Sequence, residues 1–283
     1  MMTPFVPLSH TVVDAVAELR ARNFRAGRAL RGNAQGENRT DERCENGSPV
    51  IHGGSFHEGR RPTGLLDSAP LALGPTEGDL FAAMSLNAAA AVVAYRELGR
   101  DLRAFGAPRS LRDRVRRAAW DSIRHTRFAD GLALRFGSEP ERPRIHARRP
   151  RTLAELARDN AVDGCVREAW TAALALWQAE YALAPIVREA MRDFAHDKMR
   201  HAQLAWDIHR WASGRIEESE VLAIDEASRK AIARILRAPV PFLTPATLRQ
   251  VGLPAPKTAL SLAHAVLDGI AAEAPEMRVA VGS

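Results

Sequence analysis

Two short stretches of the sequence carry the same arrangement of ionisable side chains. WDSIRHT and HDKMRHA share the pattern Asp-x-x-Arg-His, which contains Asp121, Arg124 and His125 in the first copy and Asp197, Arg200 and His201 in the second. Imidazole and carboxylate groups bind metal ions, and a carboxylate beside a metal-binding histidine commonly orients its ring. The position three residues before each histidine holds Ser122 in one copy and Lys198 in the other. The pattern therefore indicates a polar site with an unusual member in each half.

The two copies belong to a longer repeat. A shift of 76 residues superimposes both Asp-x-x-Arg-His patterns, and the same shift aligns Asn87 with Asp163 and Leu98 with Leu174. A gapless register across two helices and their turn is typical of a duplicated helical hairpin. Two such hairpins joined by one long crossover make a four-helix bundle.

The whole chain reads as helical, with no competing strand pattern. Helices are predicted over residues 10–30, 75–105, 110–136, 152–180, 185–213, 219–237 and 257–273. Thr152 with Glu155 has the spacing of a capping box, which marks a helix start. We expect an all-α protein in three parts. An N-terminal helix and a polar, flexible segment occupy 1–74, the four-helix bundle occupies 75–214, and a helical extension occupies 215–283.

One polar layer interrupts the apolar faces of the four long helices. Alternating steps of four and three residues trace a face on each helix that is apolar except at one level. At about 1.5 Å per residue, the polar positions lie at matching heights above the hairpin turns. The residues expected to converge there are Asn87, Ser122, His125, Asp163, Lys198 and His201.

This arrangement resembles the ferritin-like di-metal carboxylate superfamily, in which two helices each supply a Glu and two others each supply Glu-x-x-His. The similarity is strongest to bacterial ferritin-like domain proteins with repeats of the form Glu-…-Gly-Ala-Pro-…-Asp-Glu-x-Arg-His and Glu-Asn-Ala-Val-Glu-Gly-Cys-Val-Arg-Glu. The matching stretches here are AFGAPRSLRDRVRRAAWDSIRHT, DNAVDGCVREAW and FAHDKMRHAQLAW, within about residues 78–212. The resemblance implies a ferritin-like bundle and, in the family, two metal ions.

Four ligand positions depart from the family pattern. Where the resemblance places glutamates, this chain has Asn87, Ser122, Asp163 and Lys198, whereas both histidines are unchanged. Two divalent ions bring four positive charges, and this set offers one carboxylate and an added cation. Because a buried, unbalanced charge costs several kcal/mol, we expect a degenerate di-iron site without two-metal chemistry.

A hydrogen-bonded ion cluster is expected in place of the metals. Lys198 lies on an apolar stripe and needs a partner, which we predict to be Asp163 on the facing helix, shared with Arg167. Ser122 and Asn87 are expected to complete a network with the histidines.

The aspartates of the repeated motif are expected to orient the histidines. Asp121 and Asp197 lie just beside the bundle-facing stripes. From there each can reach across the bundle to a histidine ring, as carboxylates do behind the ligands of metal sites.

Three functions fit these features. The first is a non-catalytic binding or scaffolding protein that has lost its metals and uses no cofactor. The second is an oxygen-activating oxidoreductase with one Fe or Mn ion on His125, His201 and Asp163, a ligand set that suits Fe(II). It requires burial to keep Lys198 neutral. The third is an interaction protein that uses the arginine-rich crossover, whose arginines are Arg142, Arg144, Arg148, Arg149 and Arg151.

The composition limits the partners. The net charge is +6, but the basic residues are almost all arginine, with lysine only at Lys198, Lys230 and Lys257. That bias is typical of a GC-rich bacterial genome. The arginines are scattered among 34 acidic residues, so solvated helix faces are expected and a nucleic-acid partner is not.

The remaining features predict a cytoplasmic protein. Cys44 and Cys165 lie far apart and suggest neither a disulfide framework nor a thiol metal site. No run approaches ~18 uninterrupted apolar residues, so no membrane span is expected. The resemblance leaves a homodimer possible. The five tryptophans are expected to fill core and interface space: Trp120, Trp170, Trp177, Trp206 and Trp211.

Overall fold

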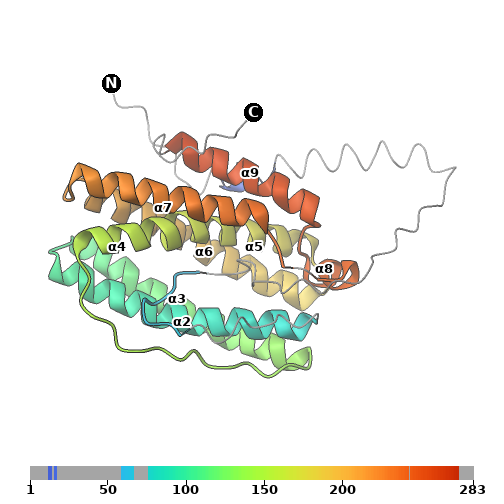
Figure 1. The fold of residues 1–283 in the computed structure, drawn as a ribbon. Coiled ribbons are helices and arrows are strands. Elements are labelled where there is room, and N and C mark those ends of the chain that lie inside the picture. The colour runs from blue at the N-terminus through green and yellow to red at the C-terminus, as the bar shows by residue number, and fades with distance from the viewer. Residues whose placement is uncertain (1–11, 15, 18–58, 67–75, 242, 274–283) are drawn as a thin grey trace.

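The computed structural model describes residues 12–14, 16–17, 59–66, 76–241 and 243–273 (Figure 1). These residues form helices and connecting loops, and the extended pairing among them is limited to one isolated bridge between Leu65 and Ile145. The all-α prediction is therefore confirmed for the described part of the chain. Most of the helix predicted over 10–30 lies outside the described residues, although 12–14, 16 and 17 are helical and Val12 is buried.

Two long hairpins form the centre of the molecule. Their elements are α2 (Glu77–Ala104) and α3 (Arg109–Arg135), followed by α4 (Leu153–Asp159), η1 (Asn160–Glu168), α5 (Ala169–Tyr181) and α6 (Pro185–Ser213). Capping boxes begin α2 at Thr76 and α4 at Thr152, and the second of them is the one that the sequence predicted. Pro185 occupies the first turn of α6, where its missing N–H costs nothing.

The third long helix is not uniform. Residues Asn160–Glu168 form a π-helix, η1, between the α-helical segments α4 and α5. Bonds from i to i+5 widen the helix, and such segments occur frequently at functional sites. The sequence pattern predicted one regular helix over residues 152–180, so the π-helical segment is the main difference between the predicted and the observed helices.

The hairpins pack through a shared apolar interior. α2 packs along α3, and α6 packs along η1 and α5, while α3 against α6 joins the two hairpins. The predicted bundle-facing residues of α3 and α6 are all buried, from Leu111 to Ala129 and from Val187 to Ala205. Those stripes were therefore assigned to the correct faces, and the polar residues within them lie in the interior.

Part of the segment 59–66 packs into the interior: Gly59, Arg60 and Pro62 are buried, whereas Thr63 and Leu66 are exposed. Arg60 is only 5% exposed. The backbone of Leu66 donates to the Arg144 carbonyl over 3.0 Å, and that of His146 donates to the Gly64 carbonyl over 2.8 Å. A Cβ atom on Gly64 would collide with the His146 carbonyl. These contacts hold one part of the segment that was predicted to be flexible, whereas residues 18–58 and 67–74 of it lie outside the described residues.

The C-terminal extension covers one side of the second hairpin. It contains α7 (Glu218–Arg237), α8 (Pro245–Val251) and α9 (Pro256–Glu273). α7 packs on η1 and α4, and α9 packs on α5 and α7, along the side away from α2 and α3 (Figure 1). Ile224, Ile232 and Leu262 share one apolar core with the second hairpin. Residues beyond 214 therefore continue the central core.

α2 is the only described helix that is long and apolar enough to cross a membrane by length and composition. In the structure 56% of its most apolar window is buried against neighbouring elements. A helix in the core of a folded protein passes the same test, so this finding is weak evidence for a membrane span.

The tryptophans are not all buried. Trp170, Trp177 and Trp206 lie in the core as expected, and Trp211 is partly buried. Trp120, however, is 65% exposed on the outer face of α3. The prediction that it fills core space is wrong, because it lies two residues from the buried position Ala118 and on the opposite face of the helix.

Candidate functional site

The repeated Asp-x-x-Arg-His residues meet across the α3–α6 contact. His125 Nε2 lies 3.0 Å from Asp197 Oδ2, and His201 Nε2 lies 3.2 Å from Asp121 Oδ2. Each histidine therefore contacts the aspartate of the other repeat, as predicted. Because an ionised carboxylate only accepts, each Nε2 carries the proton and donates it to the aspartate.

Two arginines close this crossed arrangement. Arg124 Nη2 lies 3.0 Å from Asp121 and also pairs with Asp197. Arg200 Nη2 lies 3.1 Å from Asp121 and likewise pairs with Asp197. Every charged or polar member of the repeated motif thus has a partner in the other copy. This mutual pairing gives a structural reason for the duplicated pattern.

Burial and the neighbouring charges determine the protonation states of His125 and Asp197. Burial lowers the pKa of His125 to about 4, against the opposing effect of its hydrogen bond to Asp197. Burial would raise the pKa of Asp197, but the hydrogen bond from His125 and the charges of Arg200 and Arg124 hold it well below its usual range. His125 is therefore neutral and Asp197 is ionised at pH 7.

Lys198 pairs with Glu168 rather than with Asp163. Its Nζ lies 2.9 Å from Glu168 Oε2, and the two side chains are 5% and 0% exposed. Nζ also lies 5.3 Å from the centre of the Phe194 ring. The predicted Lys198–Asp163 pair is wrong. Burial would raise the pKa of Glu168, but the charge of Lys198 lowers it, so the carboxylate is ionised.

Glu168 collects donors from three other elements. Its Oε1 accepts from the Tyr95 hydroxyl of α2 and from the backbone N–H of Arg60, each over 3.1 Å. His201 Nδ1 lies 4.0 Å from Oε2, which is too long for a hydrogen bond. That nitrogen is buried and has no hydrogen-bond partner among the described residues. Glu168 is thus the centre of the buried cluster, and the sequence analysis missed it.

The π-helix explains why Glu168 was missed. In a regular helix, residues five apart do not share a face, so a stripe through Asp163 excludes Glu168. In η1 both side chains are buried. The available signal was Glu168 itself, third from the end of DNAVDGCVREAW, which matches the last glutamate of the resembling repeat Glu-Asn-Ala-Val-Glu-Gly-Cys-Val-Arg-Glu.

Asp163 is held on another side of η1. Its Oδ1 pairs with Arg167 Nη1 over 2.7 Å, and its Oδ2 accepts from the backbone N–H of Arg61 over 3.2 Å. The predicted contact with Arg167 is present. Burial raises the pKa of Asp163 in spite of that neighbouring charge. The carboxylate therefore anchors the segment 59–66 instead of joining the histidines.

Ser122 and Asn87 do not join the network. The Ser122 hydroxyl donates to the Ala118 carbonyl of its own helix over 2.9 Å. Asn87 is half-buried on α2 and makes no hydrogen bond to a described residue. The expectation that both complete a network with the histidines is wrong, because a serine hydroxyl one turn after a carbonyl is satisfied locally.

Segment 59–66 contributes the last charge of the cluster. Arg60 Nη2 donates to Asn160 Oδ1 over 2.8 Å, and its guanidinium lies 5.5 Å from the centre of the Tyr95 ring. A Cβ atom on Gly59 would lie 2.7 Å from Lys198 Nζ, so the bare glycine backbone allows this close approach. The segment thus occupies space between α2, η1 and α6.

The donor set does not suit a metal ion in this arrangement. Among the described residues, no three His, Cys, Asp or Glu side chains lie together in a way that could hold a metal. His125, His201 and Asp163 are each directed to different partners, so the predicted one-metal set is not assembled. The Lys198 ammonium also lies beside the carboxylate that faces His201, and it would repel a divalent cation there.

The arginines of the crossover are largely neutralised within the molecule. Arg148 Nη2 and Arg151 Nη2 each lie 2.6 Å from Asp101. Arg142 Nη2 lies 2.8 Å from Asp130, and Arg149 pairs with Glu155. Their main role is to fasten the crossover to the helices, which weakens the case for this segment as a binding surface.

The comparisons with known proteins identify no family for this chain. No family model, no curated protein and no solved structure matches the sequence.

Proposed function

We propose that the chain is a ferritin-like four-helix bundle protein whose di-iron site has been replaced by a buried ion cluster, and that it acts as a non-catalytic binding or scaffolding protein. The observation that carries the proposal is the Lys198–Glu168 ion pair, 2.9 Å long and almost completely buried. It lies at the level where the family resemblance places the metals. A fixed ammonium there supplies the positive charge that a metal would bring.

The surrounding contacts support the same proposal. Glu168 is the only carboxylate that Lys198 contacts among the described residues, and Tyr95 and Arg60 donate to its other oxygen. The histidines donate to aspartates, as ligand histidines do in metal sites, but here the aspartates are also paired with arginines. These residues therefore form a buried network of ion pairs and hydrogen bonds that joins α2, α3, η1 and α6.

The runner-up is an oxygen-activating enzyme with one Fe or Mn ion. One observation favours it: His201 Nδ1 is buried without a hydrogen-bond partner among the described residues. Ring nitrogens in that condition are typical metal ligands when the other nitrogen donates to a carboxylate. An ion at this nitrogen would require Lys198 to move or to lose its proton.

Oxygen consumption during Fe(II) oxidation distinguishes the two functions. The purified protein is mixed anaerobically with Fe(II), and oxygen is then admitted and followed with an electrode. We expect oxygen to be consumed in the presence of the protein at the same rate as in a solution of Fe(II) in buffer alone. The rival enzyme predicts a faster rate that is lost in His125→Ala and kept in His264→Ala, a matched change in α9 away from the cluster. That pattern would overturn the proposed function.

A further inference from the structure

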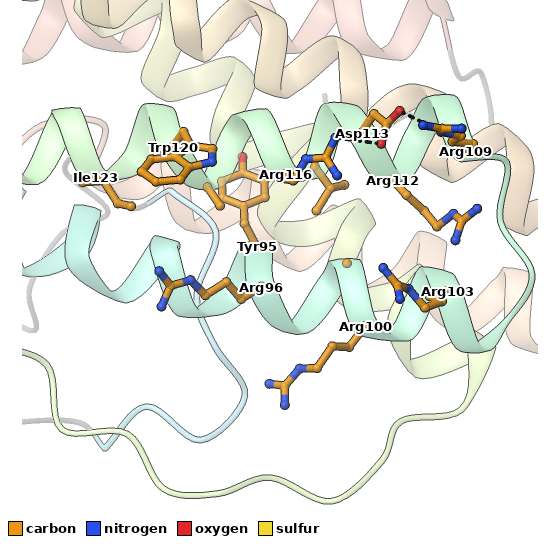
Figure 2. Close-up of a pocket in the computed structure, with 13 residues that line it drawn as sticks. Tyr95, Arg96, Arg100, Arg103, Arg109, Arg112, Asp113, Arg116, Trp120 and Ile123 are labelled. Atoms are coloured by element: carbon orange, nitrogen blue, oxygen red, sulfur yellow. Dashed lines mark hydrogen bonds and ion pairs between the residues drawn. The ribbon is translucent and has the colours of Figure 1, made fainter.

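A groove between α2 and α3 is lined by two rows of arginines. Its volume is about 1030 Å³. One row lies on α2 and the other on α3, and the arginines in them are Arg96, Arg100, Arg103, Arg109, Arg112 and Arg116. Figure 2 shows the rows on either side of the groove, with Arg103, Arg109 and Arg112 at the end near the hairpin turn. Because the two rows come from different helices, the sequence did not reveal that they form one surface.

The positive charge of the groove is poorly balanced. Asp113 is the only acidic residue that lines it, against six arginines, and it lies 3.5 Å from Arg109 and 3.1 Å from Arg116. Arg100 also lies 4.0 Å from Glu97 of its own helix. Arg96, Arg103 and Arg112 form no ion pair with a described residue, and the Nε of Arg112 is buried without a hydrogen-bond partner. This differs from the crossover, whose arginines are mostly paired. Like charges gathered in a groove attract an anion from solution.

An exposed aromatic side chain ends the groove. Trp120 lies one helical turn after Arg116, and its side chain is 65% exposed. In Figure 2 it lies with Ile123 on α3 at the end of the groove opposite Arg109, and Arg96 lies at that same end on α2. An indole in water beside cationic side chains offers a flat surface on which a nucleic-acid base can stack. Guanidinium groups in turn bind phosphate oxygens with two parallel hydrogen bonds.

We propose that the α2–α3 groove binds a short single-stranded nucleic acid, with backbone phosphates along the arginine rows and a base stacked on Trp120. From Arg109 to Trp120 the helix rises ~16 Å. At ~3.4 Å per stacked nucleotide, that length accommodates about five nucleotides. An acidic peptide would satisfy the arginines, but it supplies no base for Trp120. The proposal rests on the proposed function only in giving that binding protein its ligand.

Fluorescence anisotropy tests the proposal. The probe is a short fluorescein-labelled oligothymidylate, titrated with the full-length protein at several salt concentrations between ~50 and ~200 mM. Replacing Arg96, Arg100 and Arg103 by Gln is expected to weaken binding tenfold or more, and to reduce the slope of log K against log salt by ~2. Trp120→Ala is expected to weaken binding by ~5- to ~150-fold.

A matched variant controls for net charge. Arg234, Arg237 and Arg249 are exposed on α7 and α8, and replacing all three by Gln removes the same charge away from the groove. This variant is expected to bind the probe within about twofold of the unaltered protein. Every substituted arginine lies on the surface, so all variants are expected to fold. Circular dichroism and the melting temperature check that they do.

Three results would overturn the proposal. One is equal loss of affinity in the two arginine variants, which would indicate nonspecific attraction. Another is affinity that is unaffected by Trp120→Ala. The third is tighter binding of a polyglutamate peptide or of anionic vesicles than of the oligonucleotide in the same assay. The metal content of the protein is measured separately, so a metal-containing core would contradict the proposed function without affecting this result.

Discussion

Lys198 carries its charge at a depth where an ammonium group requires a fixed counter-charge. Glu168 provides it, and both side chains are shielded from water. In the interior, removing one member of such a pair leaves the other uncompensated, whereas replacing both by neutral groups is often tolerated. The ion pair therefore adds little net stability, but each of its members requires the other.

Lys198→Met is expected to lower the free energy of unfolding by about 3–5 kcal/mol, because it leaves Glu168 ionised and unpaired. The double change Lys198→Met with Glu168→Gln is expected to cost less than Lys198→Met alone. Denaturation in urea measures both. Lys230→Met, at an exposed position on α7, is the matched control and is expected to change stability by less than ~0.5 kcal/mol. Equal effects of Lys198→Met and Lys230→Met would show that the ion pair does not form.

His125 gives the protein a specific dependence on pH. Its pKa of about 4 in the folded protein lies below the ordinary value of 6.5, so the unfolded chain binds the additional proton between these values. Stability from this group is complete above pH 6.5 and is lost as the pH falls towards 4, by roughly 3 kcal/mol in all. The ionisable groups that face it are Asp197, Lys198 and His201.

Urea denaturation between pH 7 and pH 4.5 checks this dependence. The unaltered protein is expected to lose stability over the range, and His125→Gln is expected to show a clearly smaller loss. The same pH dependence in both proteins would mean that His125 is protonated without penalty in the fold. Carboxylates with a lowered pKa, such as Asp197, stabilise the fold above their ordinary pKa. That stabilisation is lost only below about pH 4, outside the range of this experiment.

At the residue scale, the sequence predicted contacts that follow from symmetry and missed one that follows from backbone geometry. The crossed pairs of Asp121 and Asp197 with the histidines could be predicted because the repeat places them at equivalent positions. Glu168 could not be found by helical spacing, because η1 changes which residues share a face. Consequently the partner of Lys198 was assigned to Asp163, five residues away.

η1 is the element on which the cluster depends. It places Asn160, Asp163 and Glu168 in the interior, and each of them binds the segment 59–66. Gly164 within η1 allows both that segment and α6 to approach closely. A Cβ atom at this position would collide with the Arg60 guanidinium and would lie 2.5 Å from Ala205 Cβ of α6. The helix bounds could be predicted from caps and apolar spacing, but nothing in those signals distinguishes a π-helix from an α-helix.

Gly164→Ala is expected to lower the free energy of unfolding by about 1–3 kcal/mol, because η1 and α6 must separate to admit the methyl group. Gly131→Ala is the matched control in α3, where no atom lies within 4 Å of the new methyl group. It is expected to stabilise the protein by up to ~1 kcal/mol. Thermal denaturation followed by circular dichroism measures both. Stabilisation of similar size in the two variants would contradict the close contact at Gly164.

At the scale of the whole molecule, three regions of the sequence share one interior. The segment 59–66, the two hairpins and the C-terminal helices contact one another around η1. The sequence predicted the order of the long helices, but neither α8 nor the π-helix η1, and it did not predict that a piece of the polar N-terminal stretch enters the core. Arg60 is a charged residue in a stretch with few apolar side chains, and its burial depends on Asn160 and Glu168, which lie 100 and 108 residues away in the sequence.

The central claim is that a lysine–glutamate pair stands where the resembling family holds metal ions. Elemental analysis tests it most directly, on protein produced with iron, manganese and zinc supplied and purified without chelators or metal-affinity resin. The account predicts far less than one ion of any of these metals per chain. About one ion per chain would contradict it and restore a site at His201 and its neighbours, and two per chain would show that the charge argument itself is wrong.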